Sequence, residues 1–179
     1  MYNDEAFYRK CIKKGIILDT NVLVAFLVGR YAGENVIINH ERGAYHGYIN
    51  GDYSVLEWIV NKAHRIIVTR YILSQVSDLY PLENMEKGKK INSDKVIEDI
   101  NNIMVEDCSS IEVLSRRNDT KKFGYADSSI IEIAREDYAI VTTDGKLLGY
   151  LNEIGATAIN MDRLRAMFAE ENKSLEKFR

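Results

Sequence analysis

The sequence contains very little proline or cysteine. Pro81 is the only proline among 179 residues, and no Pro- or Ser-rich linker, internal repeat or low-complexity tract divides the chain. With 46% hydrophobic content, a chain of this length can bury one sizeable core, so we expect residues 1–179 to form a single domain. Cys11 and Cys108 lie far apart without a C-x-x-C spacing, which argues against a disulfide framework and a cysteine-based zinc site.

Long hydrophobic runs and an excess of positive charge are also missing. No uninterrupted apolar run is long enough to span a membrane, and the first ten residues carry charges where a signal peptide has its apolar region. We therefore expect a cytoplasmic protein that does not enter a membrane. The net charge of −3 provides no broadly basic surface, so any contact with nucleic acid has to be local.

Short runs rich in Ile and Val, each followed by a helical pattern, make up most of the readable sequence. The runs, which we expect to be strands, occupy residues 15–19, 64–69, 138–144 and 155–161. Helical patterns cover residues 55–64, 71–80, 93–107, 126–137, 145–155 and 161–171. This alternation predicts an α/β fold in which helices cover both faces of a parallel sheet.

Three aspartates fall at informative positions in this pattern. Asp19 interrupts the most apolar stretch of the chain at the end of the first strand, and Asp144 follows a later strand in the same way. Ligands bind at the carboxyl ends of parallel strands, so these two acids are expected at the ligand-binding edge. Asp127 lies near the start of a helix, on the face that also carries Ile131 and Ala134 and should turn towards the sheet.

Each of these aspartates also has a structural interpretation. Asp144 is a good helix N-cap, Asp127 is an acid in a first helical turn, and Asp19 can belong to a strand-to-helix turn. If the three carboxylates converge, however, they repel one another unless a divalent cation binds their oxygen atoms. The sequence therefore predicts a metal site formed by Asp19, Asp127 and Asp144.

Four blocks of the sequence resemble, in order and spacing, those of the PIN-domain nucleases: IILDTNVLVAFL, RIIVTRYILSQVSDL, FGYADSSIIEIA and AIVTTDGKLLGYL. The resemblance covers about residues 15–168, with residues 29–60 as an insertion relative to the shortest members. It implies a three-layer α/β/α fold with a central parallel sheet of about five strands. It also implies an acidic pocket that binds Mg²⁺ or Mn²⁺ and hydrolyses phosphodiester bonds of single-stranded RNA.

The resemblance also assigns catalytic positions. Asp19 matches the family's first acid, Asp127 its third and Asp144 its fourth. The family's polar helper after the fourth strand matches Thr142 or Thr143. The family's second acid matches Gln75, an amide that can ligate a metal through its oxygen but supplies no charge. Asp78, three residues later on a neighbouring part of the same helix face, is a candidate substitute for that acid.

Basic side chains gather shortly before Asp127. The cluster comprises Arg116, Arg117, Lys121 and Lys122, in a stretch that we interpret as a loop. A charged loop is usually just solvated, but next to an acidic pocket it can hold the phosphates of an RNA strand.

Three functional hypotheses follow. The first is a Mg²⁺- or Mn²⁺-dependent endoribonuclease, with single-stranded RNA, an antitoxin protein and a second copy of the chain as candidate partners. The second is a catalytically weak PIN-like module that binds RNA or protein, with Gln75 as its signature. The third is an unrelated doubly wound domain of the phosphatase or receiver kind. It is disfavoured because Asn21 stands where such a phosphatase needs an aspartate, and no acidic pair precedes the strand ending at Asp19.

Overall fold

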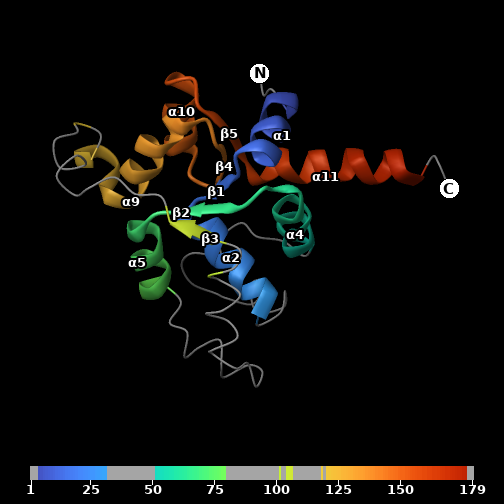
Figure 1. Ribbon diagram of the computed structural model, residues 1–179, viewed down its shortest axis with the longest axis horizontal. Helices are drawn as coiled ribbons and strands as arrows, with labels where there is room; N and C mark the ends of the chain where they lie inside the picture. Colours follow the sequence, from blue (N-terminus) through green and yellow to red (C-terminus); the bar gives the residue numbers. More distant parts are fainter. Residues whose placement is uncertain are drawn as a thin grey trace.

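The computed structural model describes residues 4–31, 51–79, 104–106 and 120–176, together with positions 101 and 118. Its helices are α1 (Asp4–Lys13), α2 (Thr20–Tyr31), α4 (Asp52–Lys62), α5 (Arg70–Leu79), α9 (Thr120–Ile133), the short 3-10 helix η1 (Ala134–Glu136), α10 (Gly145–Glu153) and α11 (Met161–Glu176) (Figure 1). Its strands are β1 (Ile16–Leu18), β2 (Ile66–Val68), β3 (Met104–Glu106), β4 (Ala139–Thr142) and β5 (Thr157–Asn160).

The described strands form one five-stranded sheet with the order β3-β2-β1-β4-β5. All four strand pairings are parallel, and Ile17 of the central strand aligns with Ile67 on one side and Ile140 on the other. Receiver-like domains have the strand order 2-1-3-4-5 instead. The order found here therefore removes the receiver-like hypothesis.

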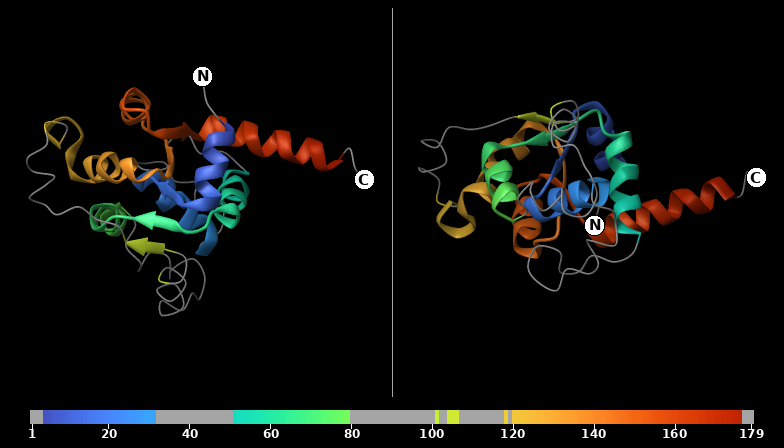
Figure 2. Two further views of the ribbon diagram at one scale, coloured as in Figure 1. Left: turned by 45° about the horizontal axis from the view of Figure 1, so that its top comes forward. Right: turned by 90° about the horizontal axis from the view of Figure 1, so that it is seen from below.

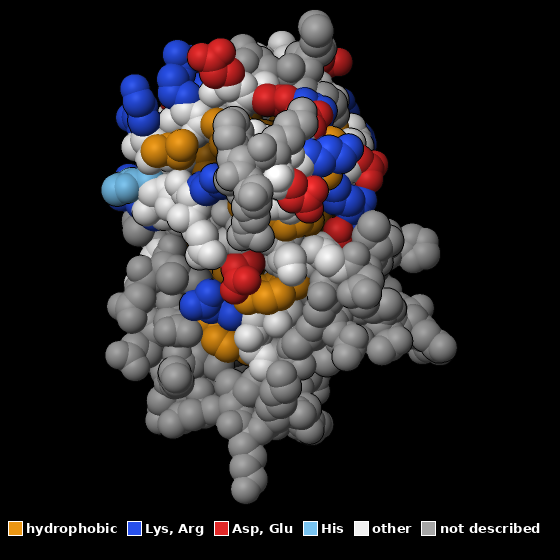
Figure 3. Space-filling view, turned by 90° about the vertical axis from the view of Figure 1, so that its right-hand side faces the viewer, with side chains coloured by type: hydrophobic (Ala, Val, Ile, Leu, Met, Phe, Trp, Pro, Cys, Tyr) orange, Lys and Arg blue, Asp and Glu red, His pale blue; other side chains and the backbone are white. Residues whose placement is uncertain are grey.

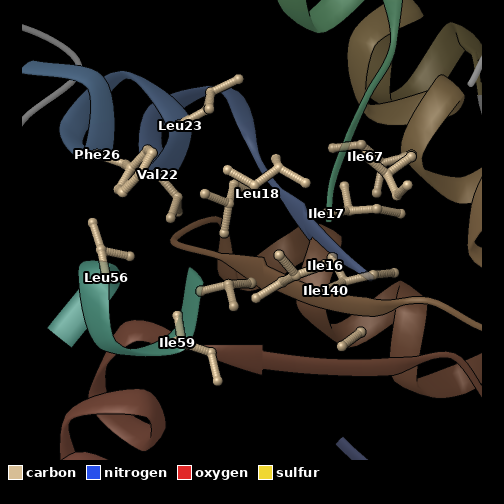
Figure 4. Close-up of a cluster of buried hydrophobic side chains, with 14 of the residues drawn as sticks. Ile16, Ile17, Leu18, Val22, Leu23, Phe26, Leu56, Ile59, Ile67 and Ile140 are labelled. Atoms are coloured by element: carbon tan, nitrogen blue, oxygen red, sulfur yellow. The ribbon is translucent and has the colours of Figure 1, made fainter. Parts of the chain in front are cut away.

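Helices cover both faces of the sheet. Ile16, Ile17 and Leu18 are all fully buried, although successive residues of a strand point to opposite faces. On one side of β1, apolar side chains of α2 and α4 lie around Leu18, namely Val22, Phe26, Leu56 and Ile59 (Figure 4). On the other side, Ile17 lies beside Ile67 of β2. The expected α/β fold with a parallel sheet covered on both faces is confirmed.

Two parts of the secondary structure differ from the sequence prediction. The helix predicted over residues 93–107 is wrong at its end, because Met104–Glu106 form the edge strand β3. An apolar run this short fits the end of a helix as well as it fits a strand, and hydrophobic periodicity cannot distinguish a helix from a strand here. The α2 helix was not predicted, because residues 22–29 are buried all round and show no polar face.

The segment predicted as an insertion, residues 29–60, contributes to the core at its end. Residues 32–50 lie outside the described ranges, but α4 begins at Asp52 and buries Leu56 and Ile59 completely. The α2 helix packs closely on α4 at Gly29, where an added Cβ would lie 2.3 Å from the Tyr53 ring. Glycine at this position allows the close approach of the two helices.

The last helix, α11, is fastened to α4 by an ion pair and by aromatic contacts. Arg165 donates to both carboxylate oxygens of Asp52 at 2.7 Å, and Asp52 is only 1% exposed. The Trp58 ring meets Phe168 of α11 edge-on at 5.4 Å and Tyr8 of α1 at 5.9 Å. These contacts join α1, α4 and α11 on the side of the molecule away from α9 and α10 (Figure 2).

We expect Arg165→Met to lower the free energy of unfolding by about 3 kcal/mol, because it leaves a buried carboxylate without its guanidinium. Urea denaturation at pH 7 measures the effect. Lys62→Met is the matched control, since Lys62 and Glu171 form an ion pair in which both side chains are 33% exposed, and its loss should cost less than about 1 kcal/mol. Equal losses in the two variants would show that burial of Asp52 does not set the strength of its ion pair.

The surface on the α11 side carries charges of both signs. Lys and Arg side chains alternate with Asp and Glu over the described part of this face, without a broad patch of one sign (Figure 3). This agrees with the near-balanced composition of 24 basic and 27 acidic residues. Among the helices within the described ranges, none has the length and apolar character needed to cross a bilayer.

Candidate active site

The candidate site lies at the carboxyl ends of β1 and β4, which are neighbours in the sheet. From β1 the chain continues to β2 on one side, whereas from β4 it continues to β5 on the other. Open parallel sheets bind ligands at such a point, where the strand order reverses. Asp19 follows β1 and Asp144 follows β4, so the strand-end placement expected from the sequence is found.

Asp19 is held in place by hydrogen bonds although it is only 5% exposed. Its Oδ2 accepts a hydrogen bond from Thr142 Oγ1 at 2.7 Å, and its Oδ1 accepts one from the Thr20 amide at 2.5 Å. Burial raises the pKa of Asp19 above its ordinary value, and the charge of Asp144 raises it further, while the hydrogen bonds from Thr142, Thr20 and the Thr143 backbone oppose the rise. This buried carboxylate therefore needs a positive charge to remain ionised at little cost.

Thr142 connects the two strand-end acids. Its buried hydroxyl donates to Asp19 and accepts a hydrogen bond from the Asp144 amide at 2.9 Å. The Asp144 carboxylate in turn accepts from the amides of Lys146 and Leu147 at 2.7 and 3.1 Å, which makes it the N-cap of α10. Asp144 thus combines its two predicted positions, at a strand end and at a helix start. The side chain of Thr143 is exposed.

Asp127 is half-buried on α9 and shares its electrostatic environment with the two strand-end acids. Its pKa is raised to about 7, first by burial and then by the charges of Asp19 and Asp144, whereas Lys146 lowers it. The charges of Asp19 and Asp144 act on Asp127, and the charge of Asp144 also acts on Asp19, so the three side chains lie within electrostatic range. The structure therefore brings Asp19, Asp127 and Asp144 into one acidic group, with Lys146 as a nearby cation.

Without divalent cations, we expect stability to fall as the pH rises from about 4 to about 7. The folded chain holds a proton on Asp127 up to a pKa of about 7, while the unfolded chain releases it near 3.8, so the folded state binds more protons in this window. Asp127→Asn should remove about 2 kcal/mol of this loss, allowing for solvent screening of a half-buried group. The measurement is urea denaturation in EDTA at pH 5 and pH 8.

The control for this pH dependence is Asp162→Asn, whose side chain is 81% exposed and should leave the wild-type pH profile unchanged. Parallel profiles for wild type and Asp127→Asn would contradict the assignment of the raised pKa to Asp127.

Gln75 contacts the site through Thr20. Gln75 Oε1 accepts a hydrogen bond from the hydroxyl of Thr20 at 2.8 Å, which ties α5 to the residue that follows Asp19. The amide that matches the family's second acid is therefore near the acidic group and contributes no charge. Asp78 lies in the last turn of α5, but its side chain is outside the described part of the chain.

Two features hold α9 beside the strand ends. The hydroxyls of Thr69, after β2, and Ser129 lie 2.7 Å apart, and Ser129 also donates to the Ala126 carbonyl at 2.6 Å. Gly124 interrupts α9 with φ 82° and ψ −179°, a conformation that favours glycine, and sets the direction of the helix that carries Asp127. Thr69 and Ser129 are not among the residues predicted from the sequence, although Thr69 follows a strand as Asp19 does.

The predicted basic cluster is only partly described. Arg116 and Arg117 lie outside the described ranges, while Lys121 and Lys122 are exposed in the first turn of α9. Lys146, which interacts with Asp127, was missed. Its position two residues after Asp144 could have identified it, because Asp144 itself is expected at the ligand-binding edge of the sheet.

The acidic group suits a divalent cation in its chemistry. Its donors are carboxylate oxygens, which Mg²⁺ and Mn²⁺ prefer. A bound cation would also offset the repulsion that the charges of Asp19 and Asp144 exert on Asp127. Within the described ranges, however, no three acidic, histidine or cysteine side chains are arranged as a ready-made metal cage. The Asp144 carboxylate also accepts hydrogen bonds from the first turn of α10. Both of these hydrogen bonds go to Oδ1, so the Asp144 Oδ2 takes no part in the cap and can bind a cation while the cap is kept.

Comparison with known proteins adds no assignment. No protein-family model matches the sequence, and a search of curated proteins found no significant match. Function therefore has to be inferred from the residues of the site, with the resemblance of the four sequence blocks to PIN-domain nucleases as an additional guide.

Proposed function

We propose that the protein is a Mg²⁺- or Mn²⁺-dependent endoribonuclease that hydrolyses phosphodiester bonds of single-stranded RNA. The observation that carries the proposal is the position of Asp19 and Asp144 at the topological switch point of the sheet, close enough to Asp127 for their charges to raise its pKa. The resemblance of the surrounding sequence to PIN-domain nucleases points to the same chemistry.

In this proposal the three aspartates hold the cation. A divalent ion bound there supplies charge neutralisation at the phosphate oxygens and lowers the pKa of a water molecule for attack on phosphorus. Thr142 orients Asp19 and, through the Asp144 amide, fixes the separation of the two strand ends. Gln75 orients Thr20 and thereby the loop that follows β1.

Asp127 has a further role, because its carboxyl group changes protonation near neutral pH. Its proton has to leave before the carboxylate can bind a cation, so metal binding should release a proton and tighten as the pH rises through about 7. The basic residues near the start of α9 are proposed to hold RNA phosphates. An antitoxin protein and a second copy of the chain remain proposed partners.

A catalytically weak RNA- or protein-binding module is the second candidate. One specific observation favours it, since Gln75 places a neutral amide beside Thr20 where the resemblance expects a carboxylate. Three acids in place of four should hold one divalent cation well and a second one poorly.

The test is cleavage of a fluorescently labelled single-stranded RNA in Mn²⁺, in Mg²⁺ and in EDTA, with the duplex of the same sequence as a comparison. We expect cleavage of the single strand in Mn²⁺, slower cleavage in Mg²⁺, and none in EDTA. Manganese should act better because it tolerates a less ideal set of ligands. Cleavage that persists in EDTA would contradict the metal-dependent mechanism.

A further inference from the structure

Two lysines from different helices converge on one aromatic ring next to the acidic group. Lys122 Nζ, at the start of α9, lies 4.9 Å from the centre of the Phe123 ring and 5.4 Å from that of Tyr150. Lys146 Nζ, at the start of α10, lies 5.2 Å from the same Phe123 ring and donates to the Lys122 carbonyl at 3.3 Å. The Phe123 and Tyr150 rings contact each other at 5.2 Å and connect the two helices.

The two like charges flank one ring, and within the described part of the chain neither is in an ion pair. Neither Lys122 nor Lys146 forms an ion pair with a carboxylate of the described residues, whereas Lys10 and Lys62 each do. Two ammonium groups near the same ring repel each other, and the faces of aromatic rings offset only part of that cost. An anion bound between or above them would remove the repulsion.

The position of these lysines indicates which anion. Lys146 lies two residues after Asp144 and interacts electrostatically with Asp127, and its hydrogen bond to the Lys122 carbonyl brings Lys122 to the same edge of the acidic group. A small free anion would be repelled by three neighbouring carboxylates. A phosphate that belongs to a longer strand is held there by its other contacts, and a compact ammonium binds such a phosphate as a point charge.

We propose that Lys122 and Lys146, carried on the Phe123–Tyr150 ring pair, form a binding site for a backbone phosphate of the RNA strand beside the one that is cleaved. This site sets the position of the strand relative to the three aspartates. It rests on the proposed function for its substrate class, but it concerns binding and does not require cleavage.

The test measures binding without cleavage. A labelled oligouridylate of about 12 nucleotides, within the range of single-strand site sizes, is titrated with wild type, Lys122→Gln and Lys146→Gln in EDTA, and fluorescence anisotropy is followed from roughly 50 to 200 mM KCl. Lys173→Gln is the matched control, because Lys173 is an exposed lysine towards the end of α11, which extends away from α9 and α10 (Figure 1).

Each of the two site variants should bind about fivefold more weakly than wild type. Each should also lower the slope of log affinity against log salt by about 0.7, the value for one phosphate contact on a single strand. Lys146→Arg should keep the wild-type slope because it keeps the charge, and Lys173→Gln should behave as wild type. Unchanged affinity in Lys122→Gln and Lys146→Gln would overturn the inference, as would weaker binding at an unchanged salt slope.

The same proteins separate this inference from the proposed function. If wild type cleaves RNA in Mn²⁺ while both variants bind normally, the phosphate site is wrong and the nuclease stands. If wild type never cleaves RNA but both variants lose affinity and salt slope, the phosphate site stands on a binding module.

Discussion

Replacing Asp19 with Asn should abolish Mn²⁺-dependent cleavage and at the same time stabilise the fold. Cleavage should fall by at least about a thousandfold, since the loss of a buried metal ligand removes several kcal/mol of charge stabilisation. Stability should rise at pH 8 in EDTA, because burial raises the pKa of Asp19 and makes its ionised form costly in the folded chain. An amide keeps the shape and can accept the hydrogen bond that Thr142 donates to Asp19, but its NH2 group then faces the Thr20 amide, which offsets part of the gain in stability.

The paired outcome distinguishes a functional carboxylate from a structural one. An aspartate that only caps α2 or supports the turn after β1 would lower stability when replaced, or leave it unchanged, and would not alter Mn²⁺ binding. Asp162→Asn serves as the control, since the Asp162 side chain is 81% exposed and is not part of the acidic group. This variant should cleave RNA like wild type. Loss of stability together with unchanged cleavage in Asp19→Asn would return Asp19 to a structural role.

Gln75→Glu is expected to raise the rate of RNA cleavage. The new carboxylate would stand where the Gln75 amide accepts the Thr20 hydroxyl, so the hydrogen bond of 2.8 Å can be kept while a negative charge is added. We expect about a tenfold gain in kcat/KM in Mn²⁺, which corresponds to about 1.4 kcal/mol of transition-state stabilisation. In EDTA the variant should be less stable than wild type, because a fourth carboxylate joins the acidic group.

Comparison with two other variants shows what the gain depends on. Gln75→Leu removes the acceptor for Thr20 and should lower cleavage. Asp78→Asn shows whether the acid later in α5 acts as a substitute, in which case cleavage should fall strongly. If neither wild type nor Gln75→Glu cleaves RNA in Mn²⁺ although both are folded, the binding-module hypothesis replaces the nuclease.

The sequence predicts the sheet well because its strands are buried on both faces. Four Ile- and Val-rich runs in alternation with helices identify β1, β2, β4 and β5. The first three are buried along their whole length, whereas β5 lies at an edge of the sheet and its first and last residues are partly exposed. The fifth strand, β3, was assigned to a helix since Met104 and Val105 extend a helical pattern. Pairing with β2 decides its structure, and such a long-range contact leaves no periodic signal.

The acidic group was predictable for a different reason. Carboxylates that follow buried strands stand out against apolar neighbours, as Asp19 and Asp144 do, and topology then brings them together. Thr142, whose hydroxyl holds Asp19, was named through the PIN-domain resemblance. Thr69, whose hydroxyl lies against Ser129 of α9, was not named, because a threonine at a strand end is ordinary in sequence. Lys146 was overlooked for a similar reason, since a lysine in a first helical turn is more often a solvated side chain.

The central claim is that Asp19, Asp127 and Asp144 bind one divalent cation, and soaking crystals in Mn²⁺ tests it most directly. We predict one strong anomalous peak with carboxylate oxygens of at least two of these aspartates at about 2.0 to 2.6 Å, the range of metal–oxygen distances for hard divalent cations. The same soak of Asp19→Asn should give no peak, or a much weaker one. A Mn²⁺ ion bound elsewhere, or carboxylates too far apart to share an ion in a fully soaked crystal, would contradict the claim.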